Sequence, residues 1–161
     1  MKKDTKERSL DQSCLNAAYR YLAYRPRSEL EIKTYLRQKG VEARSIESAL
    51  DRLKEQGLVD DLAFARFWKE NRESFSPRGQ ARLGKELREK GIKAEVIAEV
   101  VGEMDEESNA YKAAQKKARL FESSDYSVFR HKLSSFLRQR GFNWGVTQRT
   151  INRLWQESKN A

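Results

Sequence analysis

Apolar side chains recur along this chain at the spacing of one face of an α-helix. Ile46, Leu50 and Leu53, for example, lie four and three residues apart. No stretch alternates apolar and polar residues as a half-buried β-strand does, and the chain has only two prolines. The pattern therefore predicts an all-α protein, with helices at about 15–24, 28–40, 46–57, 61–73, 78–90, 94–104, 106–121, 126–139 and 143–157.

One six-residue motif occurs three times. The motif Leu-Arg-Gln-Lys-Gly-Val at 36–41 is matched by Leu-Arg-Glu-Lys-Gly-Ile at 87–92 and by Leu-Arg-Gln-Arg-Gly-Phe at 137–142. The copies are 51 and 50 residues apart, and the flanking apolar positions keep the same register. A fixed period of this kind is typical of stacked helical repeats. We interpret the chain as three copies of one supersecondary unit.

The ends of the predicted helices carry recognisable signals. Gly40, Gly91 and Gly141 stand where one helix of each copy must stop, in a left-handed conformation that glycine adopts without strain. Ser28 opens the first of these helices with the Ser-x-x-Glu spacing of a capping box. Asp60 precedes a helical run and is a good N-cap. We expect all five residues to have structural roles.

The repeat also predicts the organisation of the chain. Residues 1–10 are highly charged and are expected to form a flexible tail, and 11–75 a leading helix with the first three-helix repeat. The second repeat is expected at 76–122 and the third at 123–161. Such short units bury little apolar surface alone, so we expect them to stack into an elongated, curved, solenoid-like domain.

Composition excludes several classes of function. The chain has 161 residues and a formal net charge of +9, and its single cysteine and single histidine exclude an internal disulfide and an ordinary zinc site. Sequence motifs of nucleotide-binding loops and hydrolases are absent, as are a secretion signal and a membrane-spanning stretch. We expect a cytoplasmic protein that is not an enzyme, uses no metal or cofactor, does not bind membranes and is monomeric when free.

The basic residues are unevenly distributed. Residues 76–92 hold five basic and two acidic side chains, and 126–161 hold seven basic and one acidic, whereas 93–109 are strongly acidic. Segregated positive charge favours an acidic, extended partner over an ordinary solvated surface. The candidate contacts to acidic protein groups or DNA phosphates are Arg72, Arg78, Arg82, Lys85, Arg88, Arg138, Arg140 and Arg149.

Several short motifs occur together in a distinctive order. They are Arg-Ser-Glu at 27–29, Leu-x-x-Lys-Gly at 36–40, Gly-Leu-Val-Asp-Asp at 57–61, Lys-Glu-Leu-Arg-x-Lys-Gly-Ile at 85–92 and Phe-Leu-x-x-Arg-Gly-Phe at 136–142. In this combination the chain resembles RecX-type regulatory proteins, the modulators of the RecA recombinase. The resemblance covers about residues 14–157.

The resemblance implies a fold and a function. Proteins of this type are all-α, with three tandem three-helix units in an elongated, curved arrangement. They bind the RecA filament within its helical groove, contact neighbouring protomers, and restrain ATP hydrolysis, strand exchange, co-protease activity and filament growth. They are not enzymes.

Two other functions remain open from the residues themselves. A helix, a glycine turn and a second helix also occur in DNA-binding modules, so the basic residues could hold single- or double-stranded DNA without recombinase. Against this, Ile46, Leu50 and Leu53 assign that second helix to the core. The chain could also be a helical-repeat adaptor for another acidic protein.

Overall fold

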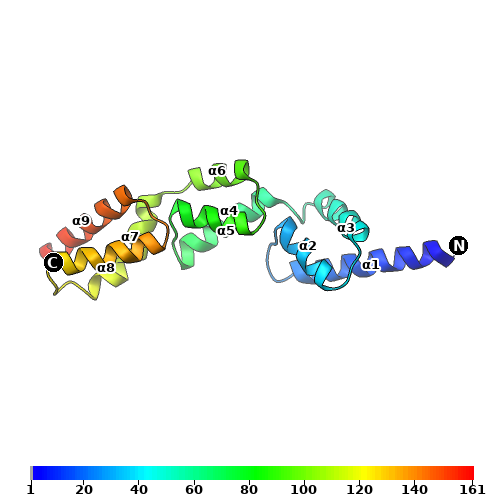
Figure 1. The fold of residues 1–161 in the computed structure, drawn as a ribbon, viewed down its shortest axis with the longest axis horizontal. Coiled ribbons are helices and arrows are strands. Elements are labelled where there is room, and N and C mark those ends of the chain that lie inside the picture. The colour runs from blue at the N-terminus through cyan, green and yellow to red at the C-terminus, as the bar shows by residue number, and fades with distance from the viewer. Residues whose placement is uncertain (1) are drawn as a thin grey trace.

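The computed structural model describes residues 2–161 and shows nine α-helices and no β-strand among them (Figure 1). Met1 lies outside the described residues. The helices are α1 (Lys2–Leu22), α2 (Glu29–Gln38), α3 (Ala43–Glu55), α4 (Asp61–Phe75), α5 (Gln80–Glu89), α6 (Ala94–Gly102), α7 (Glu106–Arg119), α8 (Tyr126–Gln139) and α9 (Trp144–Asn160). The prediction of an all-α protein is confirmed.

The first helix differs from the prediction. α1 begins at Lys2, not at Leu15, so the segment expected to be a flexible tail is helical where it is described. The segment contains neither glycine nor proline, and its lysine, arginine and glutamate residues favour helix. Because it continues a helix whose later turns are packed in the core, the segment needs no nucleus of its own.

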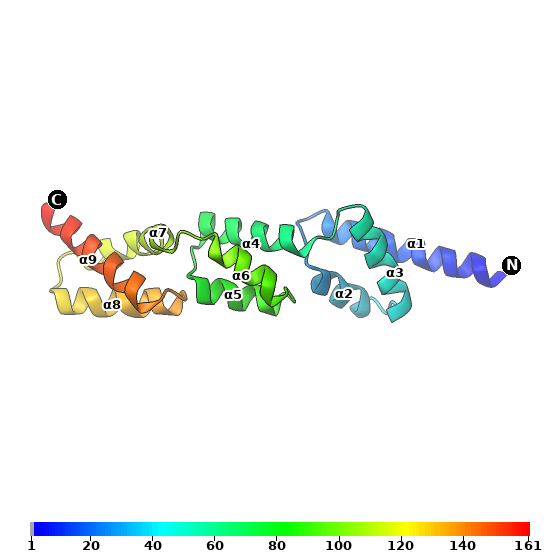
Figure 2. The same cartoon turned by 90° about the horizontal axis from the view of Figure 1, so that it is seen from above.

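Each set of three consecutive helices packs around a separate core. We call α1–α3 unit 1, α4–α6 unit 2 and α7–α9 unit 3. Unit 1 encloses Leu15, Ile32 and Leu50, among others. Phe64 and Leu87 lie in the core of unit 2, and the core of unit 3 has the same kind of residues. The three units follow one another along the long axis, with the two termini at opposite ends (Figure 2).

The predicted boundaries at 75/76 and 122/123 do not coincide with these units. α4 packs on α5 and α6, and α7 packs on α8 and α9, so each belongs with the helices that follow it. Buried Phe64 of α4 lies in the same cluster as Leu83 of α5. A periodic sequence can be divided into three-helix copies at any helix, and only the packing shows where each copy begins.

The repeated six-residue motif is a helix-ending turn. Gly40, Gly91 and Gly141 have φ angles of 78°, 78° and 86°. In the first copy, the amide of Val41 donates to the carbonyl of Leu36 (3.1 Å), and the other two copies repeat this bond. This is the Schellman arrangement, whose first and last residues are also in apolar contact. The predicted role of the glycines as helix stops is confirmed.

The predicted caps are also present. Ser28 and Glu31 form a complete capping box at the start of α2. The Asp60 side chain accepts a hydrogen bond from the amide of Ala63 (3.0 Å) and so caps α4. Both helix starts are therefore determined by local sequence.

Candidate partner interface

The three units meet at two junctions that are built in the same way. The amide of Glu29, the first residue of α2, donates to Asp61 Oδ1 of α4 (2.9 Å). The amide of Gln80, the first residue of α5, likewise donates to Glu106 Oε1 of α7 (2.9 Å). Each junction thus uses an acid at the start of the next unit to satisfy a helix-terminal amide of the previous one. Burial raises the pKa of the Asp61 carboxyl.

The repeat glycines of units 2 and 3 lie directly against the preceding unit. A Cβ atom on Gly91 would be 2.6 Å from Cβ of Leu30, and one on Gly141 would collide with Arg82. The amide of Gly79 donates to the carbonyl of Arg140 (2.8 Å), which brings two backbones together. These glycines therefore serve both a left-handed turn and a close approach between units.

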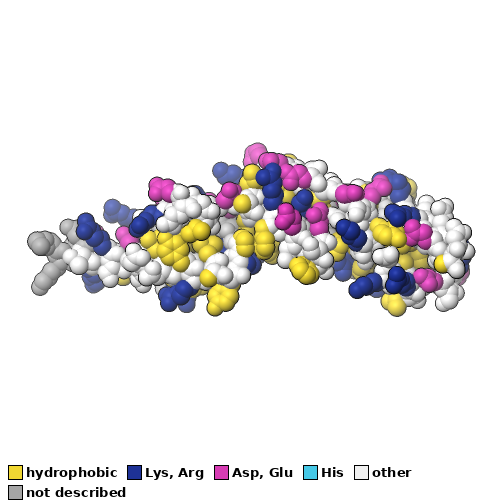
Figure 3. All heavy atoms as spheres, turned by 180° about the vertical axis from the view of Figure 1, so that it is seen from behind, with side chains coloured by type: hydrophobic (Ala, Val, Ile, Leu, Met, Phe, Trp, Pro, Cys, Tyr) yellow, Lys and Arg dark blue, Asp and Glu magenta, His cyan; other side chains and the backbone are white. Residues whose placement is uncertain are grey.

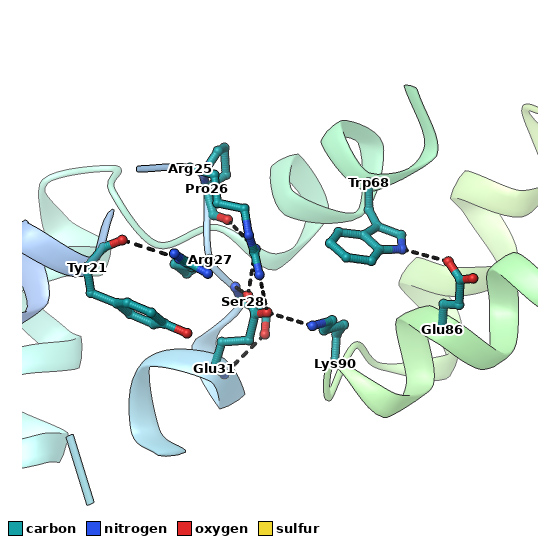
Figure 4. A network of polar contacts seen from close by, with 9 residues as sticks. All are labelled: Tyr21, Arg25, Pro26, Arg27, Ser28, Glu31, Trp68, Glu86 and Lys90. Carbon is teal, nitrogen blue, oxygen red and sulfur yellow. Dashed lines mark hydrogen bonds and ion pairs between the residues drawn. The ribbon is translucent and has the colours of Figure 1, made fainter. Parts of the chain in front are cut away.

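An ion-pair cluster crosses the first junction (Figure 4). Oε1 of Glu31 lies 2.7 Å from Arg25 and 2.8 Å from Lys90 Nζ, which belongs to the next unit. Burial alone would raise the pKa of Glu31. The hydrogen bonds from Arg25, Lys90 and the Ser28 amide outweigh that effect and lower its pKa to about 2. Glu31 is therefore ionised at neutral pH and joins unit 1 to unit 2.

A second cluster surrounds Glu86 on α5. Its carboxylate accepts hydrogen bonds from Arg72 Nε (2.8 Å) and Trp68 Nε1 (3.0 Å), and Arg78 and Arg82 lie 3.5 and 3.6 Å away. Burial opposes ionisation, but these donors keep the pKa of Glu86 below its usual range. One carboxylate does not satisfy three guanidinium groups, and Nε of Arg78 is buried without a hydrogen-bond partner.

The two clusters are connected through Trp68. Arg25, Lys90 and Arg72 all lie over its indole ring, at 4.9 to 5.5 Å from the ring centroid. At the second junction, Arg140 packs on Phe136 and donates to Ser76 Oγ (3.0 Å). We call the following set the junction strip: the cations Arg25, Arg72, Arg78, Arg82, Lys90 and Arg140 with the carboxylates of Glu31 and Glu86.

The junction strip carries a large excess of positive charge, because two carboxylates face six cations. Like-charge proximity is evident at Arg140, where burial and the neighbouring Arg78 both lower the pKa of the guanidinium. An added anion would relieve this repulsion. The strip is therefore suited to contact carboxylate or phosphate groups.

The predicted binding residues fall into two groups. Arg72, Arg78, Arg82 and Arg140 come together in the junction strip. The other four are exposed, and each is separate from that cluster. Lys85, Arg88 and Arg138 form no ion pair with any acid that the structure describes, and Arg149 is paired with Glu107 (2.6 Å).

Sequence reasoning missed Arg25, Lys90 and the two carboxylates. A signal for Lys90 was available, because a cation precedes the repeat glycine in each copy, as Lys39, Lys90 and Arg140. Glu31 was identified only as part of a capping box. Its second role depends on the neighbouring unit and is not visible in local sequence.

Unit 3 carries a separate hollow of about 520 Å³, which we call the third-unit hollow. Trp144, the first residue of α9, lies at the edge of this hollow, and its side chain is 75% exposed. Thr147 also lines it, and its hydroxyl is buried without a hydrogen-bond partner. Arg130 and Arg138 add positive charge. An exposed aromatic face beside two cations is suited to bind an aromatic or anionic ligand.

Acidic side chains gather over the middle of the molecule (Figure 3). Glu99 and Glu103 of unit 2 both pair with Arg66, at 3.0 and 2.9 Å. The acidic segment is thus partly neutralised within unit 2. In the described part of the chain, no group of three or more His, Cys, Asp or Glu side chains could hold a metal ion. None of the helices described is long and apolar enough to cross a membrane.

Comparison with known families accounts for the three units. The model of the first three-helix domain of RecX matches residues 14–53, the second domain matches 60–101 and the third matches 105–151. The chain belongs to the RecX family. The three matched ranges fall on units 1, 2 and 3, so RecX domains begin at α1, α4 and α7.

Individual relatives match over most of their length. Regulatory protein RecX of Prosthecochloris aestuarii is 35% identical over 143 residues, which cover 89% of this chain and 94% of the relative. The RecX of Chlorobium limicola is 33% identical over 139 residues, with 86% and 87% covered. The crystal structure of RecX from Lactobacillus salivarius superposes with a TM-score of 0.79 at 21% identity, covering 91% of this chain and 97% of that one, and shares the fold.

Proposed function

We propose that this chain binds the RecA recombinase filament in its helical groove and inhibits the filament's ATPase, strand-exchange and co-protease activities. Membership of a family of regulatory proteins named RecX supports the choice of partner. The observation that carries the proposal is the junction strip, in which two carboxylates face six cations along an elongated chain of three units.

The geometry suggests how inhibition would arise. A long, narrow protein in a groove would contact more than one filament protomer and would restrain their movement relative to one another. Uncompensated cations speed the encounter with an acidic filament and its DNA, and this contribution weakens with salt. Inhibition of this kind requires no catalytic group on the chain itself.

The direct test measures ATP hydrolysis by recombinase filaments on single-stranded DNA as the purified protein is added. We expect inhibition at protein concentrations comparable to that of the recombinase. Unchanged hydrolysis at stoichiometric protein would overturn the proposal. Repeating the titration at higher salt should shift the inhibition curve to higher protein concentration.

The role of the basic surface is tested best at Lys85 and Arg88. Arg78 and Arg82 are unsuitable, because reversing their charge would also place carboxylates beside Glu86. Lys85 and Arg88 are exposed and form no ion pair with an acid that the structure describes, so the double change to glutamate should cost little stability and weaken inhibition by about tenfold.

A matched control changes the same charge elsewhere on the surface. Lys112 and Lys116 of α7 are exposed, and their double change to glutamate lowers the net charge by the same amount. This control should inhibit the filament almost as well as the unaltered protein. Equal inhibition by the two double variants would remove Lys85 and Arg88 from the contact surface.

The third-unit hollow favours a second function, direct binding of single-stranded DNA. An exposed tryptophan beside cations is a common platform for base stacking. Trp144→Ala should then weaken binding to an oligonucleotide in the absence of recombinase. Phe75 is equally exposed outside the hollow, so Phe75→Ala is the control. No binding by the unaltered protein would exclude this function.

A further inference from the structure

No other unit of the described chain packs against the Lys39-Gly40 turn of unit 1. The equivalent turns of units 2 and 3 each pack against the preceding unit. In units 2 and 3, Gly91 and Gly141 lie against α2 and α5 of the preceding unit. A Cβ atom on Gly40 would meet nothing within 4 Å. The corresponding surface of unit 1 is therefore open.

The cation beside each glycine shows the same difference. Lys90 Nζ binds the carboxylate of Glu31 from the preceding unit, at 2.8 Å. Lys39, its equivalent in unit 1, forms no ion pair with an acid among the described residues and lies 5.5 Å from the centroid of the Tyr35 ring. The lysine that binds a carboxylate in unit 2 is therefore available in unit 1 to bind a carboxylate of a partner.

The open turn lies in a groove of about 950 Å³, which we call the unit 1 groove. One wall is α1, and stacked Tyr21 and Tyr35, 4.1 Å apart, contribute aromatic surface. Arg20, Arg27 and Lys39 line the groove, with Glu42 as the one acidic residue of its lining. The groove is thus basic and partly apolar.

A second copy of this chain is a poor occupant. A second copy would offer the start of α8 in unit 3, because α8 is the counterpart of α2 and α5. At its N-terminal end α8 is one turn longer than those two helices. Lys132 stands nine residues before Gly141, where Glu31 stands nine before Gly40. Stacking of copies would bring Lys132 toward Lys39, so a second copy would not offer Lys39 the carboxylate that Glu31 offers Lys90. A partner that carries a carboxylate at this position complements the groove better than a second copy does.

We propose that the unit 1 groove binds the first turn of an acidic helix of the recombinase, as α2 binds the turn of unit 2. A glutamate or aspartate near the start of that helix pairs with Lys39, and the helix backbone packs against Gly40. The inference rests on the proposed function and adds to it a contact at the end of the chain distant from the third-unit hollow.

The test places a side chain on the open turn without breaking it. Asparagine tolerates the left-handed conformation better than other residues with a side chain, so Gly40→Asn keeps the turn and obstructs the groove. Gly57→Asn is the matched control, because Gly57 has a φ of 69° and equally free space. Lys39→Glu is a second variant, which removes the cation while leaving Gly40 intact.

The readout is inhibition of recombinase ATPase, with thermal unfolding of each variant measured alongside. Gly40→Asn and Lys39→Glu should each raise the concentration for half inhibition about tenfold, while Gly57→Asn has little effect. Equal inhibition by all three variants and the unaltered protein would overturn this inference and leave the proposed function standing. No inhibition by the unaltered protein would overturn both.

Discussion

Glu31 allows a quantitative test of how units 1 and 2 are joined. We consider Glu31→Gln, which removes the negative charge but keeps an oxygen for the capping box. The pKa of Glu31 falls from the usual 4.5 to about 2, and its side chain is 11% exposed. Each pKa unit corresponds to about 1.4 kcal/mol, so the full lowering of the Glu31 pKa corresponds to about 3 kcal/mol of folding stability. Since Arg25 and Lys90 are partly exposed, we expect a measured loss of about 2 kcal/mol at pH 7.

The pH dependence distinguishes a charge effect from a packing effect. A carboxylate with a lowered folded-state pKa contributes its full stability above pH 4.5 and loses it as the pH falls toward 2. Glutamine lacks this contribution at every pH. The stability difference between the two proteins should therefore be full at pH 7 and shrink progressively between pH 4.5 and 2.

The assay is urea unfolding of both proteins at a series of pH values. Glu29→Gln serves as a control on the same helix, because Glu29 is more exposed and should cost about 0.5 kcal/mol. A loss at Glu31 no larger than at Glu29, or one that does not change between pH 7 and pH 2, would refute the ionic account of the first junction.

Three further predictions concern stability, each measured by urea unfolding. Gly91→Ala and Gly141→Ala should each lower the free energy of unfolding by several kcal/mol, because the added methyl group meets the preceding unit. Gly40→Ala should lower it by only about 1 kcal/mol, through its backbone conformation. Equal losses in the three variants would contradict the close approach between units. Thr147→Val should raise stability by about 1 kcal/mol because it removes a buried hydroxyl without a partner, and a loss would indicate a hydrogen bond at that site. Asp60→Ala should cost about 1 kcal/mol through loss of the α4 cap, and no change would argue against that cap.

Local signals predicted most of the fold. The helices from α2 to α9 lie within a few residues of the expected ranges, because glycine turns, N-caps and apolar spacing are all determined by neighbouring residues. The predicted start of α1 was wrong, because a charged segment without packing residues shows no periodic spacing of apolar residues. The grouping of α4 with α5 was not visible either, because periodicity does not reveal which neighbour a helix packs against.

The candidate site was predicted only in part. Charge segregation identified Arg72, Arg78, Arg82 and Arg140, which the fold brings together. It did not identify Glu86, because an acid within a basic segment resembles ordinary charge alternation. Contacts between residues far apart in sequence, such as Lys90 with Glu31, require knowledge of how the units stack.

The polar construction of the junctions has a mechanical consequence. The principal helix–helix contacts all lie within units, and the junctions are held mainly by ion pairs, capped amides and glycine backbones. Bending at a junction would therefore expose polar groups that water can satisfy, and would leave the three cores intact. The chain resembles a jointed rod, in which each unit can change its angle to the next without disturbing its own core.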